Sequence, residues 1–340
     1  MGFDLGHAFQ VYQNLGGLVR IFLGILVAAL IGTLVWYVFS EDKRAWRWHY
    51  RTILVSVVTL GFALLLVGYL HLAIYLALPL ELPPKLAPMI NHWLKTMGHG
   101  VLPPYRPEAP PRFLLPPWLE REKFLFWFSG YAVMAIWACR GVSFRFTRAT
   151  LSALLSLQLL ILLFINPFTD PLPRFFEEIR PWTMPLSLME RARLFARLYP
   201  RMVFFYNAHY MWVHPPLLFL SYAALTVFFV ACLSMLVIKR PELDQMAYRF
   251  ARPGYIALTM GMLLGFPWAL KAWGPNWWWD PKIASSIMMW LVFSTYFHAR
   301  LYLTRRGMWS FVSWLGIICF VAMLYTFAAS YLFPGEHTVH

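Results

Sequence analysis

The stretch Ile21–Phe39, IFLGILVAALIGTLVWYVF, contains no charged residue. It is about as long as a helix must be to cross the hydrocarbon core of a membrane. The whole chain has the same character, because 60% of its 340 residues are hydrophobic and only 13% are charged. We therefore predict an all-α fold, a polytopic membrane helix bundle in a single membrane domain at 1–340. About eight transmembrane helices are expected, at 18–39, 52–80, 124–139, 150–166, 215–238, 254–271, 283–301 and 309–333.

Basic residues follow every second predicted span. They are Lys43, Arg44, Arg47, Arg51, Arg140, Arg145, Arg148, Lys239, Arg240, Arg249, Arg252, Arg300, Arg305 and Arg306. The positive-inside rule places such short basic segments in the cytoplasm. Both termini, two long loops at 81–123 and 167–214, and the segment 272–282 are then expected on the outer face. Short basic segments beside membrane spans therefore explain the net charge of +14. The expected partner is a lipid bilayer, and no nucleic acid partner is expected.

The two long outer loops differ in composition. The first is proline-rich around one amphipathic piece, APMINHWLKTM (87–97), and the second contains PLSLMERARLFARLYPRM (185–202). Apolar residues recur there at roughly helical spacing beside several arginines, which predicts a helix lying on the outer membrane surface. We expect no disulfide and no zinc site, since the three cysteines lie in separate apolar runs. No cleavable signal peptide is expected either, because no small-residue cleavage site follows the first run.

The segment between the sixth and seventh predicted spans is WGPNWWWDPK, Trp273 to Lys282. Tryptophan is common at membrane interfaces, and an aromatic belt would explain one or two of the four indoles. The alternative is a platform for a flat, largely apolar ligand, because aromatic faces suit such a molecule. The sequence leaves both interpretations open, with Asp280 closing the turn.

Three histidines are expected on the same outer face. His214 precedes the fifth predicted span, where Pro215 and Pro216 fit the first turn of a helix, and His337 and His340 follow the eighth span. A lone interfacial histidine is usually a plain polar residue. Histidines from two helix ends beside an aromatic platform fit a bis-imidazole site for haem iron.

His298 lies inside the seventh predicted span, near its cytoplasmic end. Ionisable residues within spans are functional candidates, although this side chain can also extend toward the cytoplasm beside Arg300. His49, at the entry of the second span, is a candidate second buried ligand. His71 lies at the wrong depth to pair with His298.

These segments resemble the haem-handling (WWD-domain) proteins of cytochrome c maturation, of the CcmF, CcsA and CcmC type. The tryptophan signature of that family matches at Trp273, Gly274, Trp277, Trp279, Asp280 and Pro281. The segment HPPLLFLSYAAL resembles the region of its first external haem-ligand histidine. STYFHAR resembles the segment of its transmembrane histidine, and ASYLFPGEHTVH the region of its second external histidine.

The resemblance implies a haem-binding protein that presents haem to apocytochrome c for thioether formation, as a component of a cytochrome c haem lyase. His214 and His337 would be axial ligands of a non-covalently bound b-type haem, and His298 would contact a second haem. His340 is the rival of His337, since CcsA-like spacing favours His337 and CcmF-like spacing favours His340. The platform would comprise Trp273, Gly274, Trp277, Trp278, Trp279, Asp280 and Pro281, and the propionate partners would come from Arg174, Arg180, Arg191 and Arg197.

The resemblance also implies a bacterial inner membrane, with the haem loop on the periplasmic side and other maturation subunits as partners. Two other functions stay open. Ile283 stands where CcmF and CcsA usually have Glu, which leaves room for a non-catalytic membrane subunit of a respiratory complex. A transporter would show discontinuous helices or paired polar residues within its spans, and this chain has few.

Overall fold

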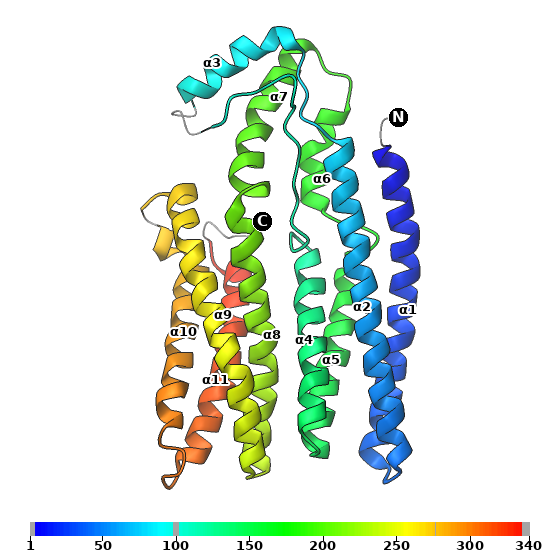
Figure 1. Cartoon of the computed structure of the whole chain (residues 1–340), viewed down its shortest axis with the longest axis vertical. Helices are drawn as coiled ribbons and strands as arrows, with labels where there is room; N and C mark the ends of the chain where they lie inside the picture. The colour runs from blue at the N-terminus through cyan, green and yellow to red at the C-terminus, as the bar shows by residue number, and fades with distance from the viewer. Residues whose placement is uncertain (1–3, 98–101, 276, 335–340) are drawn as a thin grey trace. The chain divides into compact units, whose positions relative to one another are not determined.

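The computed structural model describes residues 4–97, 102–275 and 277–334 (Figure 1). The chain forms two compact units, and several helices contribute to both. Unit 1 comprises residues 1–22, 61–125 and 164–212, and unit 2 comprises residues 23–60, 126–163 and 213–340.

Every predicted span is a helix. The helices are α1 (Leu5–Phe39), α2 (Lys43–Ala77), α4 (Glu122–Gly141), α5 (Arg145–Ile165), α8 (His209–Val237), α9 (Pro241–Trp273), α10 (Pro281–Arg300) and α11 (Met308–Leu332). Among the described residues, six helices are long and apolar enough to cross a membrane, namely α1, α2, α5, α8, α9 and α11. The shorter α4 and α10, of 20 residues each, correspond to the third and seventh predicted spans. The protein is thus a polytopic helical membrane protein.

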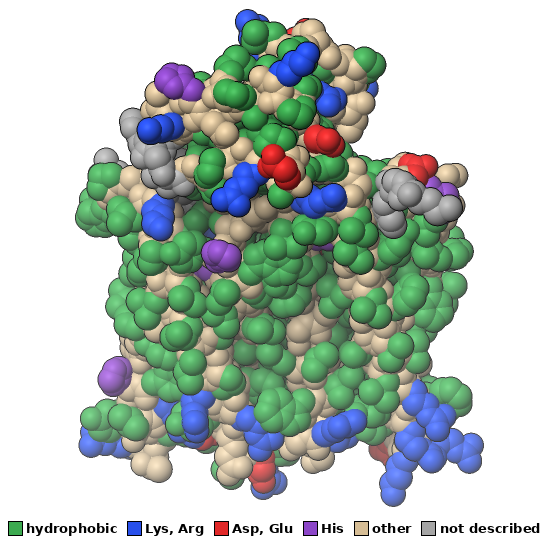
Figure 2. Space-filling view, turned by 45° about the horizontal axis from the view of Figure 1, so that its top comes forward, with side chains coloured by type: hydrophobic (Ala, Val, Ile, Leu, Met, Phe, Trp, Pro, Cys, Tyr) green, Lys and Arg blue, Asp and Glu red, His purple; other side chains and the backbone are tan. Residues whose placement is uncertain are grey.

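Several helices begin earlier than predicted, because basic segments belong to the helices. Helix α2 begins at Lys43 and α9 at Pro241, well before the apolar runs at 52 and 254. Lysine and arginine are good helix formers, and a proline in the first turn gives up an N–H that would have no partner there. The turns between α1 and α2, α4 and α5, α8 and α9, and α10 and α11 form what we call the basic end of unit 2. Figure 2 shows its Lys and Arg side chains along the lower edge, below a band of apolar side chains.

The predicted start of the fifth span is wrong. Helix α8 begins at His209, so Pro215 and Pro216 lie inside it. Pro215 has no N–H for the carbonyl of Met211, four residues earlier. The indole N–H of Trp118 donates to that oxygen instead, at 2.6 Å. This external donor explains how a proline is tolerated within the helix.

The two long outer segments contribute three α-helices to unit 1, α3 (Ala87–Met97), α6 (Pro173–Ile179) and α7 (Leu188–Arg201). Helix α3 coincides with the predicted amphipathic piece. A capping box between Ser187 and Glu190 begins α7. The apolar face of α7 is buried in the protein, where Phe195 packs edge-on against Tyr105 with ring centroids 5.1 Å apart. This burial corrects the prediction that α7 lays its apolar face on the membrane.

Helices α8 and α9 run side by side in unit 2 (Figure 1) and touch at glycines of α9. A Cβ atom on Gly254 would lie 3.1 Å from the Cβ of Ala224, and one on Gly261 would lie 2.8 Å from Leu218. The Ser221 hydroxyl donates to the carbonyl of Gly254 at 2.8 Å. Small residues allow membrane helices to approach this closely. The glycines therefore allow α8 and α9 to pack closely against each other.

Candidate functional site at the tryptophan-rich turn

The turn between α9 and α10 is built by its glycine and its aspartate. Gly274 ends α9 with a φ of 77°, a conformation that favours glycine. The Asp280 carboxylate caps α10 by accepting the backbone N–H groups of Lys282 and Ile283, at 3.0 and 3.3 Å. Pro281 occupies the first turn of α10. Asp280 thus has a structural role that the sequence analysis did not anticipate, and Ile283 contributes its backbone to that cap.

The tryptophans of this turn differ in their surroundings. Trp278 and Trp279 are 47% and 69% exposed and stack on each other, with ring centroids 4.3 Å apart. Trp277 packs against Phe266 of α9 at 4.8 Å. Trp273 ends α9, and its side chain lies outside the described part of the structure. The turn therefore presents two exposed, stacked indoles, and a third indole, Trp277, that packs against α9.

His214 lies in the second turn of α8 and packs against α9. Its Nδ1 is 2.6 Å from the carbonyl oxygen of Gly261, and a carbonyl only accepts, so Nδ1 carries the proton. A Cβ atom on Gly265 would lie 2.6 Å from ring atoms Cε1 and Nδ1 of His214. The tautomer places the lone pair on Nε2. Histidines that ligate metals usually donate their other nitrogen to a carbonyl or carboxylate in this way.

Helix α9 connects His214 with the tryptophan turn. Gly265 contacts the imidazole, and its neighbour Phe266 contacts Trp277. In Figure 1 the end of α11 lies at the same end of unit 2 as the α9–α10 turn. His337 and His340 themselves lie outside the described residues, so both remain predictions.

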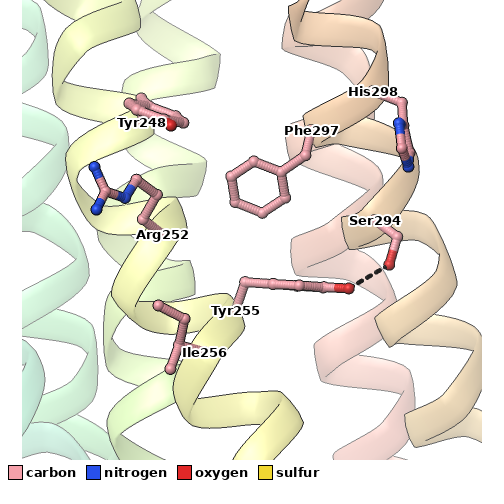
Figure 3. Close-up of a pocket in the computed structure, with 7 residues that line it drawn as sticks. All are labelled: Tyr248, Arg252, Tyr255, Ile256, Ser294, Phe297 and His298. Atoms are coloured by element: carbon pink, nitrogen blue, oxygen red, sulfur yellow. Dashed lines mark hydrogen bonds between the residues drawn. The ribbon is translucent and has the colours of Figure 1, made fainter.

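For His298 the sequence left two alternatives open, a functional residue within the span and a side chain that extends toward the cytoplasm. His298 is an exposed side chain on α10, at the edge of a hollow of about 290 Å³ between α9 and α10. Figure 3 shows Phe297 pointing toward α9 while His298 hangs from α10 beside Ser294. His298 lies on the side of α10 that other helices do not cover. Hydropathy alone does not predict which side of a helix its neighbours cover.

His49 is fully buried in unit 2 at the basic end. Its Nδ1 lies 2.9 Å from the Thr33 hydroxyl, and its ring stacks on Tyr37 with centroids 6.0 Å apart. Helices α4 and α8 lie between α2 and α10 in Figure 1. The structure therefore does not bring His49 and His298 together.

Sequence reasoning missed Gly261, Gly265 and Trp118. The two glycines form a GxxxG pattern, MGMLLGF, which is a known signal for close helix packing in membranes. That pattern would have predicted a close neighbour for α9. It would not have identified the neighbour as the turn of α8 that carries His214.

Known proteins resemble parts of the chain. The model of the family described as cytochrome C assembly protein matches residues 118–337. A cytochrome c biogenesis protein CcsA of Cyanidium caldarium is 42% identical over 82 residues, which are 23% of this chain and 28% of that protein. A probable cytochrome c-type biogenesis protein NrfE of Escherichia coli (strain K12) is 28% identical over 202 residues, which are 58% of this chain and 33% of that protein.

The matched part of the chain thus spans a third or less of the length of these two curated relatives. No solved structure matches the chain. The family match covers well over half of the chain and includes His214, the tryptophan turn and His298. The chain therefore belongs to the cytochrome c assembly protein family.

Proposed function

We propose that this protein takes part in cytochrome c maturation by binding haem at the tryptophan turn and presenting it to apocytochrome c. The single observation that carries the proposal is the arrangement along α9. Gly261 and Gly265 hold the His214 ring, and Phe266 packs against Trp277, which precedes the exposed indole stack of Trp278 and Trp279 in the same turn. An oriented imidazole and flat apolar faces are the two elements that a haem site needs from a protein.

The residues present fit a haem. The proton of His214 is on Nδ1, so Nε2 carries the lone pair through which a neutral imidazole binds iron, and Trp278 and Trp279 expose aromatic area that would otherwise face solvent or headgroups. Asp280 holds the turn by capping α10. Of the proposed ligands, His337 or His340 would supply the second imidazole. The haem would be b-type and non-covalently bound.

In this proposal, each part of the chain has a defined task. Haem, when bound, supplies two vinyl groups, each of which an apocytochrome thiol joins by adding sulfur to one carbon and hydrogen to the other. His214 would hold the iron, and the indoles of Trp278 and Trp279 would cover the macrocycle and keep water from it. The arginines of unit 1 proposed as carboxylate partners are Arg174, Arg180, Arg191 and Arg197, because guanidinium groups bind carboxylates in a bidentate fork.

We further propose a bacterial inner membrane with the tryptophan turn on the periplasmic side and other maturation subunits as partners. The basic end of unit 2 supports this orientation through the positive-inside rule. His298 remains the proposed contact of a second haem. His49, enclosed by Thr33 and Tyr37, is not proposed as its partner, because helices α4 and α8 lie between α2 and α10, and such a partner would come from another subunit.

Attachment to an apocytochrome tests this proposal. The purified protein, reconstituted with haem and reductant, is incubated with an apocytochrome that carries a CxxCH motif, and thioether formation is followed by haem staining. Wild type should form the holocytochrome, alone or with its partner subunits. Replacing Trp278 and Trp279 by Ala should reduce the yield, and replacing them by Phe should restore part of it. If the protein binds no haem and forms no holocytochrome even with its partner subunits, the result would instead fit a non-catalytic membrane subunit of a respiratory complex.

A further inference from the structure

One face of α9 changes character along the helix. Gln245, Arg249, Arg252, Ile256 and Met260 follow one another at intervals of three or four residues, which places them on one face of a helix. Gln245, Arg249 and Arg252 are exposed near the basic end. Ile256 and Met260 are 58% and 46% exposed farther along α9. The face is therefore basic at one end and apolar beyond it.

Two adjoining hollows lie along this face, in what we call the α9–α10 groove. One of about 290 Å³ is lined by Tyr248, Arg252, Tyr255, Ile256, Ser294, Phe297 and His298 (Figure 3). The other, of about 460 Å³, shares Tyr248, Arg252 and Ile256 with it, and its wall also includes Arg249 and Arg300. Figure 3 shows Arg252 across the opening from Phe297. The lining of the groove thus combines arginine side chains with aromatic and aliphatic ones.

The charges of the groove are not balanced. Arg300 is neutralised by a two-point bond to Asp244, at 2.8 and 2.6 Å. Arg249 and Arg252 face the rings of Trp137 and Tyr248, at 6.0 and 5.6 Å from the centroids. Within the described part of the chain, neither of these two guanidinium groups forms an ion pair, and no carboxylate lines either hollow.

We propose that the α9–α10 groove binds an anionic phospholipid. Arg249 and Arg252 would take the phosphate, because guanidinium groups bind phosphate oxygens through paired hydrogen bonds. Ile256 and Met260 would support an acyl chain that follows α9 into the membrane. Basic pockets at the ends of membrane helices favour anionic headgroups. A zwitterionic lipid should bind more weakly, because the described lining of the groove offers no carboxylate to its ammonium group.

This proposal depends on the chain spanning a membrane and does not depend on haem binding at the tryptophan turn. Its test therefore measures lipid and haem separately. The full chain is purified in detergent and titrated with phosphatidylglycerol or phosphatidylcholine. Bound lipid is counted by native mass spectrometry, and haem is measured by absorbance.

The key variant is Arg249→Gln/Arg252→Gln. Its matched control is Arg44→Gln/Arg47→Gln, which removes two exposed basic residues of α2 at the same basic end. Wild type and control should bind phosphatidylglycerol in preference to phosphatidylcholine. The groove variant should bind phosphatidylglycerol about tenfold more weakly or worse. If the double variant does not fold, the singles Arg249→Gln and Arg252→Lys replace it, and Arg252→Lys should keep part of the preference.

Three outcomes would overturn the proposal. Equal weakening in groove variant and control would show a general attraction to the basic surface. Equal binding of both lipids by wild type would show an apolar groove without headgroup recognition. Loss of haem from the groove variant with phosphatidylglycerol binding intact would assign the two arginines to porphyrin carboxylates.

Discussion

The His214 ring and the backbone of Gly265 lie so close that a methyl group at position 265 would fall within 2.6 Å of ring atoms Cε1 and Nδ1. The carbonyl of Gly261, one helical turn earlier, accepts a hydrogen bond from the Nδ1–H of the same ring. The two glycines of α9 thus fix both the position and the tautomer of an imidazole on α8.

Replacing Gly265 by Ala should displace the His214 ring and weaken haem retention. Crowding a packed contact of this kind costs about 1–3 kcal/mol. The measurement is the Soret absorbance per mole of purified protein. Gly254→Ala is the matched control, because its methyl group meets Ala224 at 3.1 Å and no histidine. Equal haem content in the two variants would show that the Gly265 contact does not position the ligand.

The Asp280 cap predicts a specific order among three substitutions. Asp280→Ala should lower stability by about 0.5–2 kcal/mol, because the first turn of α10 loses its acceptor. Asp280→Ser and Asp280→Asn keep a capping oxygen and should restore most of the melting temperature. Haem content measured on the same samples separates the cap from a direct role. A Ser variant that melts like wild type yet loses haem would show that the carboxylate also serves the ligand.

The bond from the Trp118 indole to the Met211 carbonyl predicts a rescue by a second substitution. Trp118→Phe leaves that carbonyl without its donor, at a cost of about 1–3 kcal/mol. Adding Pro215→Ala supplies an intrahelical N–H to the same oxygen, so the double variant should regain part of the loss. Thermal unfolding of the two single variants and the double variant measures the effect. Strictly additive losses would contradict this role for Trp118.

The carboxylate of Glu120 predicts a pH dependence of stability. Burial raises the pKa of Glu120, while the N–H groups of Arg174 and Phe175 and nearby guanidinium groups partly oppose the shift. The folded state therefore holds its proton more tightly than the unfolded state. The contribution of Glu120 to the free energy of unfolding is therefore fully present below the ordinary glutamate pKa. It is lost as the pH rises through the raised pKa of the folded state.

Glu120→Gln should flatten that part of the profile of melting temperature against pH. The difference between wild type and the Gln variant isolates Glu120 from other carboxyl groups. An unchanged slope would mean that Glu120 is solvated more fully than the structure indicates.

The long apolar runs predicted the positions of eight helices, because about 20 apolar residues leave few alternatives to a span. Among the described residues, six of these helices are long and apolar enough to cross a membrane. Helix boundaries were less predictable. Helix α2 begins at Lys43, before the apolar run, because charged lysine and arginine side chains have a high helix propensity. The start of α8 was wrong because Pro215 is tolerated only through Trp118, a contact from a distant part of the sequence.

The candidate site was predictable in its composition and only partly in its geometry. The clustered indoles and His214 were identified from the sequence. Their connection through Gly261, Gly265 and Phe266 depends on how α8 and α9 align, which no single helix determines. The exposure of His298 likewise depends on which side of α10 its neighbours cover.

The absorption spectrum of the detergent-purified protein tests the central claim most directly. Wild type should show the Soret and visible bands of a six-coordinate haem. His214→Ala should lose most of that haem or change its bands, and added imidazole should restore them by replacing the missing ligand. His209→Ala, in the first turn of the same helix, should match wild type. A His214→Ala spectrum identical to wild type in intensity and band position would contradict the assignment of His214 as a haem ligand.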